Sequence, residues 1–323
     1  MLCLLGPTAS GKSSLAFWLA QEIPEIEIIS MDSAQIYRGM NIGTAKPTAA
    51  ECAQVPHHLI DILDPAESYS AARFVQDAQK AAEHIRARGK IPIIVGGTML
   101  YFKALSEGLD DLPTVPAEIR AQIADEARAA GWPALHQQLT RIDPETARRL
   151  NPNDAQRISR ALELYRHTGE SMTTLIARSV ARGTRQPASE RLRVVGLLPE
   201  DRAWLHQRIG RRFEQMLAEG FLDEVRGLFH RGDLHSGLPS MRCVGYRQAW
   251  DHLAGLISYE AFVDAAIAAT RQLAKRQITW LRGFSDITRV DPQGQAQTAR
   301  QLCKALILAD SACDRSGPTI TTE

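Results

Sequence analysis

Short apolar runs alternate along this chain with longer segments in which apolar residues recur at helical spacing. The short runs, which predict strands, lie at Leu2–Leu5, Ile26–Met31, Ile91–Val95, Leu192–Leu198 and Ile287–Val290. Helical spacing is found at Lys12–Gln21, Ala71–Arg88, Thr98–Ser106, Asp201–Glu219 (with Gly220 as a C-cap) and Tyr259–Leu281. The alternation predicts an α/β fold with a mainly parallel sheet flanked by helices.

One connection between these elements is much longer than the fold requires. Roughly 85 residues separate Ser106 from Leu192, whereas a parallel crossover needs only about a dozen. Helical patterns fill the excess at Ala117–Ala130, Pro133–Arg141 and Asp154–His167. We therefore predict an α/β core of residues 1–111 and 187–309, an inserted all-helical subdomain of residues 112–186, and a disordered tail of small polar residues at 310–323.

Composition places the chain among ordinary folded proteins. It has 323 residues, of which 44% are hydrophobic and 23% charged, and this excludes a disordered, collagen-like or coiled-coil chain. Because the net charge is only +1, a nucleic-acid partner must be held by local basic patches. The five cysteines are scattered without a C-x-x-C pair, which predicts a reducing compartment and argues against a disulfide framework or a zinc site.

The apolar start of the chain bears on its localisation. Met1–Leu5 lacks a basic region before it and leads directly into a glycine loop, so it predicts a strand rather than a signal peptide. The short lead-in suggests a natural start a few residues upstream. Since no apolar run approaches the ~20 residues of a membrane helix, we expect a cytoplasmic protein without membrane spans.

A phosphate-binding motif follows the first predicted strand. The sequence GPTASGKS fits G-x-x-x-x-G-K-[ST] and opens a predicted helix, the context in which backbone N–H groups and the helix N-terminus bind phosphates. The predicted diphosphate-binding residues are Gly6, Pro7, Thr8, Ala9, Ser10, Gly11, Lys12 and Ser13. Lys12 suits the outer phosphate, and the Ser13 hydroxyl suits Mg²⁺, which is the predicted cofactor. The motif alone does not distinguish a diphosphate from a triphosphate ligand.

The acidic residues around this loop leave the chemistry open. The strand Ile91–Val95 ends in Gly96 and Gly97, without the acid of a Walker B motif. Asp32, which follows the strand Ile26–Met31, suits either a metal ligand or a general base. A P-loop small-molecule kinase therefore remains an alternative, as does a nucleotide-gated RNA-binding module without catalysis.

Six longer motifs indicate a family. In chain order they are GPTASGKS, DSAQIY, NIGTAKP, GGTMLYFKAL, RCVGYRQ and TRQLAKRQITWLR. Together they closely resemble the bacterial tRNA dimethylallyltransferases, also called isopentenyl-tRNA transferases, over nearly the whole chain. The resemblance implies a P-loop-type core, a monomer, and two substrates, dimethylallyl diphosphate and the anticodon stem-loop of tRNA. The implied acceptor is N6 of adenosine 37, 3′-adjacent to the anticodon, in tRNAs that read codons beginning with U; diphosphate is released.

The resemblance also assigns roles that agree with the chemistry. Asp32 would accept the proton of N6, a general-base effect typically of ~10²–10⁴-fold. Thr98 would hydrogen-bond the substrate, and Arg212 would join Lys12 and an Mg²⁺ on Ser13 in offsetting the charge of the leaving diphosphate. Without the resemblance, Arg212 and Arg208 are also consistent with a solvated basic helix face.

Basic residues predict how a nearly neutral protein holds tRNA. Arg157 and Arg160 flank an apolar stripe of the insertion and suit phosphate contacts, although solvated faces have the same pattern. Chemistry on a base also requires a pocket for a flipped adenine. The resemblance implies tRNA contacts at Asp32, Ser33, Ala34, Gln35, Thr98, Arg120, Gln156, Arg157, Ile158, Ser159, Arg160, Arg242, Cys243, Val244, Gly245, Tyr246, Arg247, Lys275, Arg276, Gln277, Ile278, Thr279, Trp280, Leu281 and Arg282.

The remaining candidates favour structural roles. His57 and His58 are adjacent, and neighbouring residues of a strand face opposite ways, so packing is favoured over a metal pair. Cys243 is interpreted as a small buried residue, and Trp280 as part of a core stripe with Phe262, Ala266 and Leu273, because these positions share one helix face. Trp204 and Trp250 are interpreted as core residues for the same reason.

Overall fold

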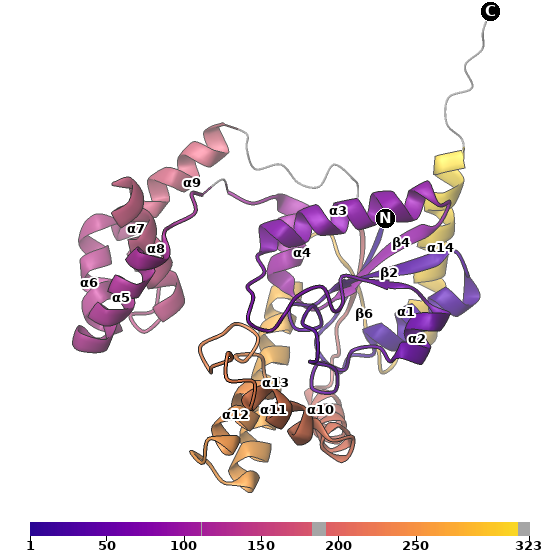
Figure 1. Ribbon diagram of the computed structural model, residues 1–323. Coiled ribbons are helices and arrows are strands. Elements are labelled where there is room, and N and C mark those ends of the chain that lie inside the picture. Colours follow the sequence, from indigo (N-terminus) through magenta and orange to yellow (C-terminus); the bar gives the residue numbers. More distant parts are fainter. Residues whose placement is uncertain (111, 183–191, 316–323) are drawn as a thin grey trace, which may run out of the picture. The chain divides into compact units, whose positions relative to one another are not determined.

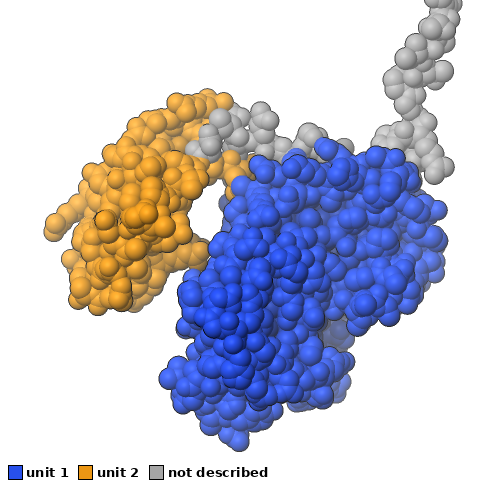
Figure 2. All heavy atoms as spheres, viewed as in Figure 1, with its two compact units in different colours: residues 1–106, 190–323 blue, residues 107–189 orange. Residues whose placement is uncertain are grey.

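The computed structural model describes residues 1–110, 112–182 and 192–315, and it divides into two compact units (Figures 1 and 2). One unit comprises residues 1–106 and 190–323, and the other comprises residues 107–189. The sequence predicts the boundaries of the insertion at 112 and 186. Each unit is described by itself.

A parallel sheet forms the centre of the larger unit, as predicted. Among the described residues its order is β3-β2-β4-β1-β5-β6, and every pair is parallel. The strands are β1 (Leu2–Leu5), β2 (Ile26–Met31), β3 (His57–His58), β4 (Ile91–Gly96), β5 (Arg193–Leu197) and β6 (Thr288–Val290). The short edge strand β3 has no apolar run and was not predicted. Apolar runs predict the other five; β1, β2, β4 and β5 are mostly buried, as expected of strands covered on both faces, whereas the edge strand β6 buries only Val290.

The sheet register aligns three strand ends that bear on function. Leu5 of β1 lies opposite Gly96 of β4, which in turn lies opposite Met31 of β2. The residues that follow these positions leave the sheet at its carboxyl edge, where ligands bind in open α/β sheets. The phosphate loop, the Gly-Gly loop and the Asp32 segment therefore begin side by side.

Helices cover both faces of the sheet (Figure 1). On one face α1 (Lys12–Glu22) and α14 (Ala296–Arg315) share an apolar cluster with the strands. On the other face α3 (Ala71–Ala87) packs against β2 and β4. The alternating directions of strand side chains supply apolar groups to both layers. α14 continues to Arg315, so the prediction that the tail is disordered from residue 310 was wrong up to this point; residues 316–323 lie outside the described residues.

The remaining helices of this unit are α2 (Ala49–Gln54), α4 (Met99–Glu107), α10 (Arg202–Ala218), α11 (Phe221–Phe229), α12 (Tyr246–Leu253) and α13 (Tyr259–Gly283). The last four share a second apolar cluster with the segment after β2. Phe213, Phe221, Tyr246 and Phe262 form edge-to-face ring contacts, and Tyr37 packs in the same cluster. The cluster therefore fixes where the chain goes after Asp32.

The long helix α13 faces the core with a different stripe from the predicted one. Its buried residues include Phe262 and Ala266, as predicted, but then Ala274, Gln277 and Leu281. Trp280 is 37% exposed and Leu273 is only partly buried, so their assignment to the core was wrong. Trp250 is buried as predicted, whereas Trp204 is partly buried. The sequence cannot show that small and polar side chains are needed where this helix meets the glycine loops.

The smaller unit is helical, as predicted. It contains α5 (Ala117–Ala130), α6 (Trp132–Ile142), α7 (Pro144–Arg149), α8 (Ala155–Thr168) and α9 (Met172–Ala181). Its core consists of apolar residues at helical spacing, including Ile123, Leu135, Leu139, Ile158 and Leu162. α7 and α9 were not predicted, and each begins with an N-cap side chain, Asp143 and Ser171 respectively. No helix in the described part of the chain is long and apolar enough to cross a membrane.

Candidate active site

The phosphate loop lies between β1 and α1, where the motif predicts it. Gly11, the N-cap of α1, is left-handed with a φ of 96°, and Ala9 has a φ of 62°. The first turn of α1 has no acidic residue to oppose the positive end of the helix dipole. The loop therefore presents backbone N–H groups and a helix N-terminus to an anion.

Lys12 is coupled electrostatically to residues far away in the sequence. Its Nζ donates to the carbonyl of Pro7 at 3.4 Å. Burial lowers the pKa of Lys12 to about 8; the carboxylate of Asp32 opposes this shift and the guanidinium of Arg212 adds to it. The structure thus brings the predicted phosphate-binding lysine close to two of the three predicted catalytic residues, Asp32 and Arg212.

Gln277 connects the phosphate loop with the Gly-Gly loop. Its Oε1 accepts the backbone N–H of Thr8 at 2.8 Å, and its Nε2 donates to the carbonyl of Gly97 at 2.9 Å. A side chain at position 97 would prevent this, because a Cβ there would lie 2.5 Å from Nε2. Gln277 is buried and both ends of its amide are occupied. This bridging role was not predicted, and the side chain is unsuited to the predicted tRNA contact.

Two arginines of α10 approach the phosphate loop in different ways. The Nε of Arg208 donates to the carbonyl of Ala9 at 2.8 Å, while its guanidinium lies over the ring of Trp204. Arg208 therefore supports the loop backbone. Arg212 lines the central cavity, and burial lowers its pKa while the nearby Asp32 opposes this shift. Of these two arginines, only Arg212 is among the described residues that line the cavity.

Asp32 leaves the sheet beside the phosphate loop with one carboxylate oxygen already bonded. Oδ1 accepts the backbone N–H groups of Ala34 at 2.8 Å and Gln35 at 3.3 Å. Thr98 holds the same turn, since its Oγ1 accepts the N–H of Ser33 at 3.0 Å. The carboxylate is therefore fixed in direction. None of the hydrogen bonds that Asp32 accepts from described residues involves Oδ2.

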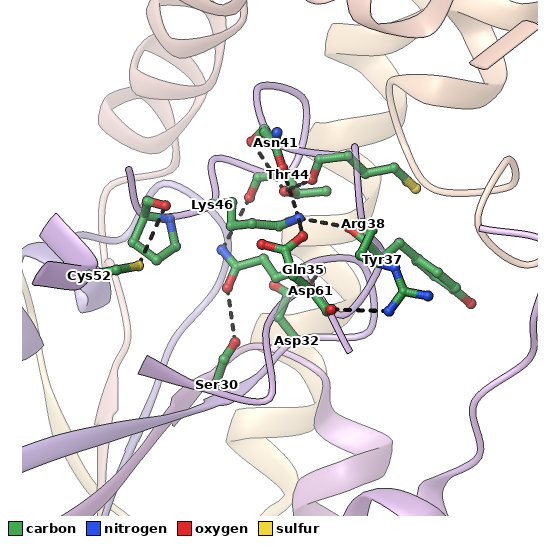
Figure 3. A network of polar contacts seen from close by, with 12 residues as sticks. Ser30, Asp32, Gln35, Tyr37, Arg38, Asn41, Thr44, Lys46, Cys52 and Asp61 are labelled. Carbon is green, nitrogen blue, oxygen red and sulfur yellow. Dashed lines mark hydrogen bonds and ion pairs between the residues drawn. The ribbon is translucent and has the colours of Figure 1, made fainter. Parts of the chain in front are cut away.

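The segment after this turn is held by a network of polar contacts (Figure 3). Gln35 accepts a hydrogen bond from Ser30 and donates to the carbonyls of Thr44 and Ala45. The Lys46 ammonium, whose side chain is 3% exposed, donates to the Tyr37 carbonyl and the side chains of Asn41 and Asp61. Lys46 was not singled out from the sequence, although it lies within the NIGTAKP motif.

These loops surround an open cavity of about 830 Å³ within the larger unit. Polar residues among its lining include Lys12, Ser13, Asp32, Thr98 and Arg212. Apolar and aromatic residues among its lining include Ile209, Phe213, Met216, Leu273 and Trp280. A cavity lined by both charged and apolar side chains suits a small amphiphilic phosphate ester.

The residues present fit a magnesium ion bound together with a phosphate ligand. Ser13 lines the cavity one position after Lys12, and Asp32 lines it from the next loop. Mg²⁺ usually takes one or two protein oxygens, its other ligands being waters and substrate phosphates. The described residues contain no group of three or more His, Cys, Asp or Glu side chains that could hold a metal ion.

The predicted tRNA contacts of the larger unit differ in accessibility. Exposed residues are Ser33, Arg242, Arg247, Lys275, Arg276, Thr279, Trp280 and Arg282. Half-buried residues are Asp32, Ala34, Gln35, Thr98, Cys243, Val244 and Ile278, so the prediction that Cys243 is buried holds only in part. Gly245, Tyr246, Gln277 and Leu281 are buried. Because they are buried, the side chains of Tyr246, Gln277 and Leu281 do not offer a surface to tRNA.

The predicted contacts of the helical unit are also divided. Arg120, Gln156 and Arg157 are exposed, and Ser159 is half-buried. Ile158 has no exposed surface because it belongs to the apolar core of the unit, so the prediction that it contacts tRNA was wrong for its side chain. Arg160 donates to the carbonyl of Pro113, and burial lowers its pKa. Arg157 is therefore the more available cation.

The adjacent histidines have structural partners, as expected. His57 Nδ1 lies 2.7 Å from the carbonyl oxygen of Val55, and burial lowers its pKa. His58 Nε2 lies 2.6 Å from Glu27, which also accepts from Arg88. Each ring thus has a contact that accounts for one of its nitrogens within the fold.

Comparisons with known proteins identify the family of the chain. A family model described as IPP transferase matches residues 35–284. Proteins named tRNA dimethylallyltransferase from Ralstonia pickettii (strain 12J) and Cupriavidus taiwanensis are 59% and 57% identical to the chain over 292 residues, with 90% of each chain covered.

Solved structures give the same result. A tRNA isopentenylpyrophosphate transferase from Bacillus halodurans aligns with a TM-score of 0.67 and 34% identity, covering 97% of this chain and 98% of its own. A eukaryotic dimethylallyltransferase acting on tRNA aligns with a TM-score of 0.72 and 26% identity, covering 100% of this chain and 81% of its own.

Proposed function

The chain belongs to the IPP transferase family, and from this premise we infer that it transfers the dimethylallyl group of dimethylallyl diphosphate to tRNA. The observation that carries this function is one cavity lined by the phosphate loop, by Asp32 and by apolar side chains. The phosphate loop suits the diphosphate, the apolar side chains of the lining suit the five-carbon group, and Asp32 suits the acceptor amine.

We propose that the reaction is an attack of the acceptor amine on carbon. The N6 lone pair of adenosine forms a bond to C1 of the dimethylallyl group, the C1–O bond breaks, and its electron pair leaves with diphosphate. Oδ2 of Asp32 takes the proton from N6. Because an exocyclic amine has its lone pair delocalised into the ring, a positioned base is needed. The fixed orientation of Oδ1 supports this role.

The leaving diphosphate needs positive charge. Lys12 from α1 and Arg212 from α10 would supply it, and the N-terminus of α1 would add backbone N–H groups. Mg²⁺, when bound, would offset further charge on the diphosphate from a position near Ser13. Thr98 holds the Asp32 turn through Ser33, which makes it a positioning residue as well as a candidate substrate contact.

The finer assignments are part of the same proposal. They are adenosine 37 as acceptor, tRNAs that read codons beginning with U, and a monomeric cytoplasmic enzyme. The exposed arginines and lysines of α8, α12 and α13 would bind tRNA phosphates, and a flipped adenine would enter the cavity. A small-molecule kinase is not favoured, because β4 ends in Gly96 and Gly97 without an acid and the relatives are tRNA transferases.

Transfer of label tests this function directly. Purified protein, Mg²⁺, labelled dimethylallyl diphosphate and an unmodified anticodon stem-loop should give label covalently attached to adenosine 37. A stem-loop with guanosine at position 37 is the matched control and should acquire none. ATP turnover without label transfer would overturn the proposal in favour of a kinase.

A further inference from the structure

The carboxylate of Glu224, in the first turn of α11, accepts hydrogen bonds from the loop Asn41–Gly43, about 180 positions earlier in the chain. Oε2 accepts the backbone N–H groups of Asn41 and Ile42, both at 2.8 Å, and Oε1 accepts that of Gly43 at 3.3 Å. The Tyr246 hydroxyl also donates to Oε1. Three successive N–H groups converging on one anion form a backbone nest. Glu224 is not among the residues that line the cavity.

Two aromatic rings also pack against the Asn41–Gly43 loop. Phe221 and Tyr246 lie edge to face with ring centroids 5.2 Å apart. A Cβ at Gly43 would lie 2.3 Å from a Phe221 ring carbon and 2.6 Å from a Tyr246 ring carbon. Glycine at this position therefore allows the backbone to reach the carboxylate. Burial, and then the charge of Glu224, raises the pKa of Tyr246, so its hydroxyl stays a donor.

The loop that Glu224 holds is bonded in turn to the Asp32 segment. The carbonyls of Thr44 and Ala45 accept from Gln35, whose own backbone N–H donates to Asp32 Oδ1 (Figure 3). Tyr246 lies within the predicted tRNA-contact segment Arg242–Arg247, but its side chain is buried. One carboxylate outside the cavity thus joins two of its walls.

We propose that Glu224 is a positioning residue, which holds the Asn41–Gly43 loop against α12 and thereby orients Gln35 and Asp32 for proton transfer from the acceptor. The inference rests on the proposed function, because it assigns Asp32 as the base. The proposed role of Glu224 is independent of the diphosphate site, because other residues, Gln277 and Arg208, hold the phosphate loop.

The variant Glu224→Gln tests this role. Its amide can keep one oxygen on Asn41 and Ile42, but its NH₂ group would face the N–H of Gly43. Displacement of the loop by about 1 Å should lower kcat roughly 10–100-fold. The affinity for dimethylallyl diphosphate, measured by titration, should stay within about twofold, because independent sites show little coupling. Hydrogen exchange at the amides of residues 41–43 should become faster.

Two further variants make the outcome decisive. Glu219→Gln is the same change at an exposed carboxylate that accepts only from Gln215 in the described structure, and it should leave kcat and exchange unchanged. Tyr246→Phe keeps the ring and removes one donor; its loss of kcat should be about 2–5-fold alone and nearly absent in the Glu224→Gln background.

The results that contradict the inference are distinct from failure of the proposed function. Unchanged kcat in Glu224→Gln, or equal loss of kcat and dimethylallyl diphosphate affinity, would overturn the positioning role. Additive losses in the double variant would overturn the coupling to Tyr246. If the wild-type protein transfers no label, the proposed function fails, while unchanged exchange at residues 41–43 in Glu224→Gln would separately show that Glu224 does not hold the loop.

Discussion

The two units hold their polar groups in different ways. In the larger unit, side chains bond loop backbone from far along the chain: Gln277 accepts from Thr8 over 269 positions, Arg208 donates to Ala9 over 199, and Glu224 accepts from Asn41 over 183. In the described part of the smaller unit, the widest separation of a recorded side-chain hydrogen bond is 47 positions. Proton transfer at one atom needs side chains whose positions are set by the whole fold. Contacts with tRNA phosphates, which we propose for the smaller unit, need mainly exposed positive charge.

From this comparison we expect the largest loss of activity when a side chain positioned by the fold of the larger unit is changed. Asp32→Asn keeps the size and part of the hydrogen bonding but cannot take a proton, so kcat should fall about 10²–10⁴-fold. Dimethylallyl diphosphate affinity should change little. If this affinity falls as well and added Mg²⁺ restores part of the loss, Asp32 acts mainly as a metal ligand. Single-turnover label transfer and equilibrium binding distinguish the two roles.

Removing the bridge between the glycine loops should have the next largest effect. Gln277→Leu leaves the Thr8 N–H and Gly97 carbonyl without this partner, and each such buried loss costs about 1–3 kcal/mol. We expect dimethylallyl diphosphate affinity to fall roughly 10–100-fold, because 1.4 kcal/mol is about tenfold. Gln272→Leu makes the same change at an exposed position of α13 and should leave this affinity unchanged. Equal losses in both variants would refute the bridging role.

The lowered pKa of Lys12 predicts a pH dependence. Burial lowers this pKa to about 8, so the free protein loses the positive charge as pH rises through that value. The diphosphate needs the charged form, and its affinity should therefore be nearly constant below pH 8 and fall above it by up to about tenfold per pH unit. Titrations between pH 7 and pH 9 measure this. Lys12→Ala should bind more weakly at all pH values and lack the step near pH 8; a step that persists would assign it to another group.

The smallest effect is expected in the helical unit. Arg157→Ala removes an exposed side chain whose ion pair in the described structure is with Asp154, the half-buried N-cap of its own helix, so thermal stability should change little. Affinity for the anticodon stem-loop should fall a few-fold, and the slope of log affinity against log salt should decrease by up to about one phosphate contact. Arg128→Ala, a second exposed arginine paired within its helix, is the control. The same slope in Arg157→Ala and wild type would contradict a phosphate contact.

Local sequence determined the parts of this protein that depend on neighbouring residues. The strand–loop–helix around Gly6–Ser13 was predicted because glycine conformation and helix polarity act within a few residues. The helices of the insertion were predicted from apolar spacing, and α5 has the predicted bounds. The position of Asp32 at the carboxyl edge of the sheet could be predicted because it directly follows a strand, and parallel strands all end at the same edge.

Only the tertiary structure decided which side chains hold that site. Gln277 and Trp280 lie on one helix, and apolar spacing assigns the tryptophan to the core, yet the glutamine is buried and the tryptophan exposed. The reason is that Gln277 satisfies backbone groups of two loops that meet at this helix, and an unpaired buried backbone group is costly. Glu224 and Asn41 are likewise joined only after folding. A single sequence carries no spacing signal for such contacts, because their partners are set by the order of strands in the sheet and by the helices that pack around it.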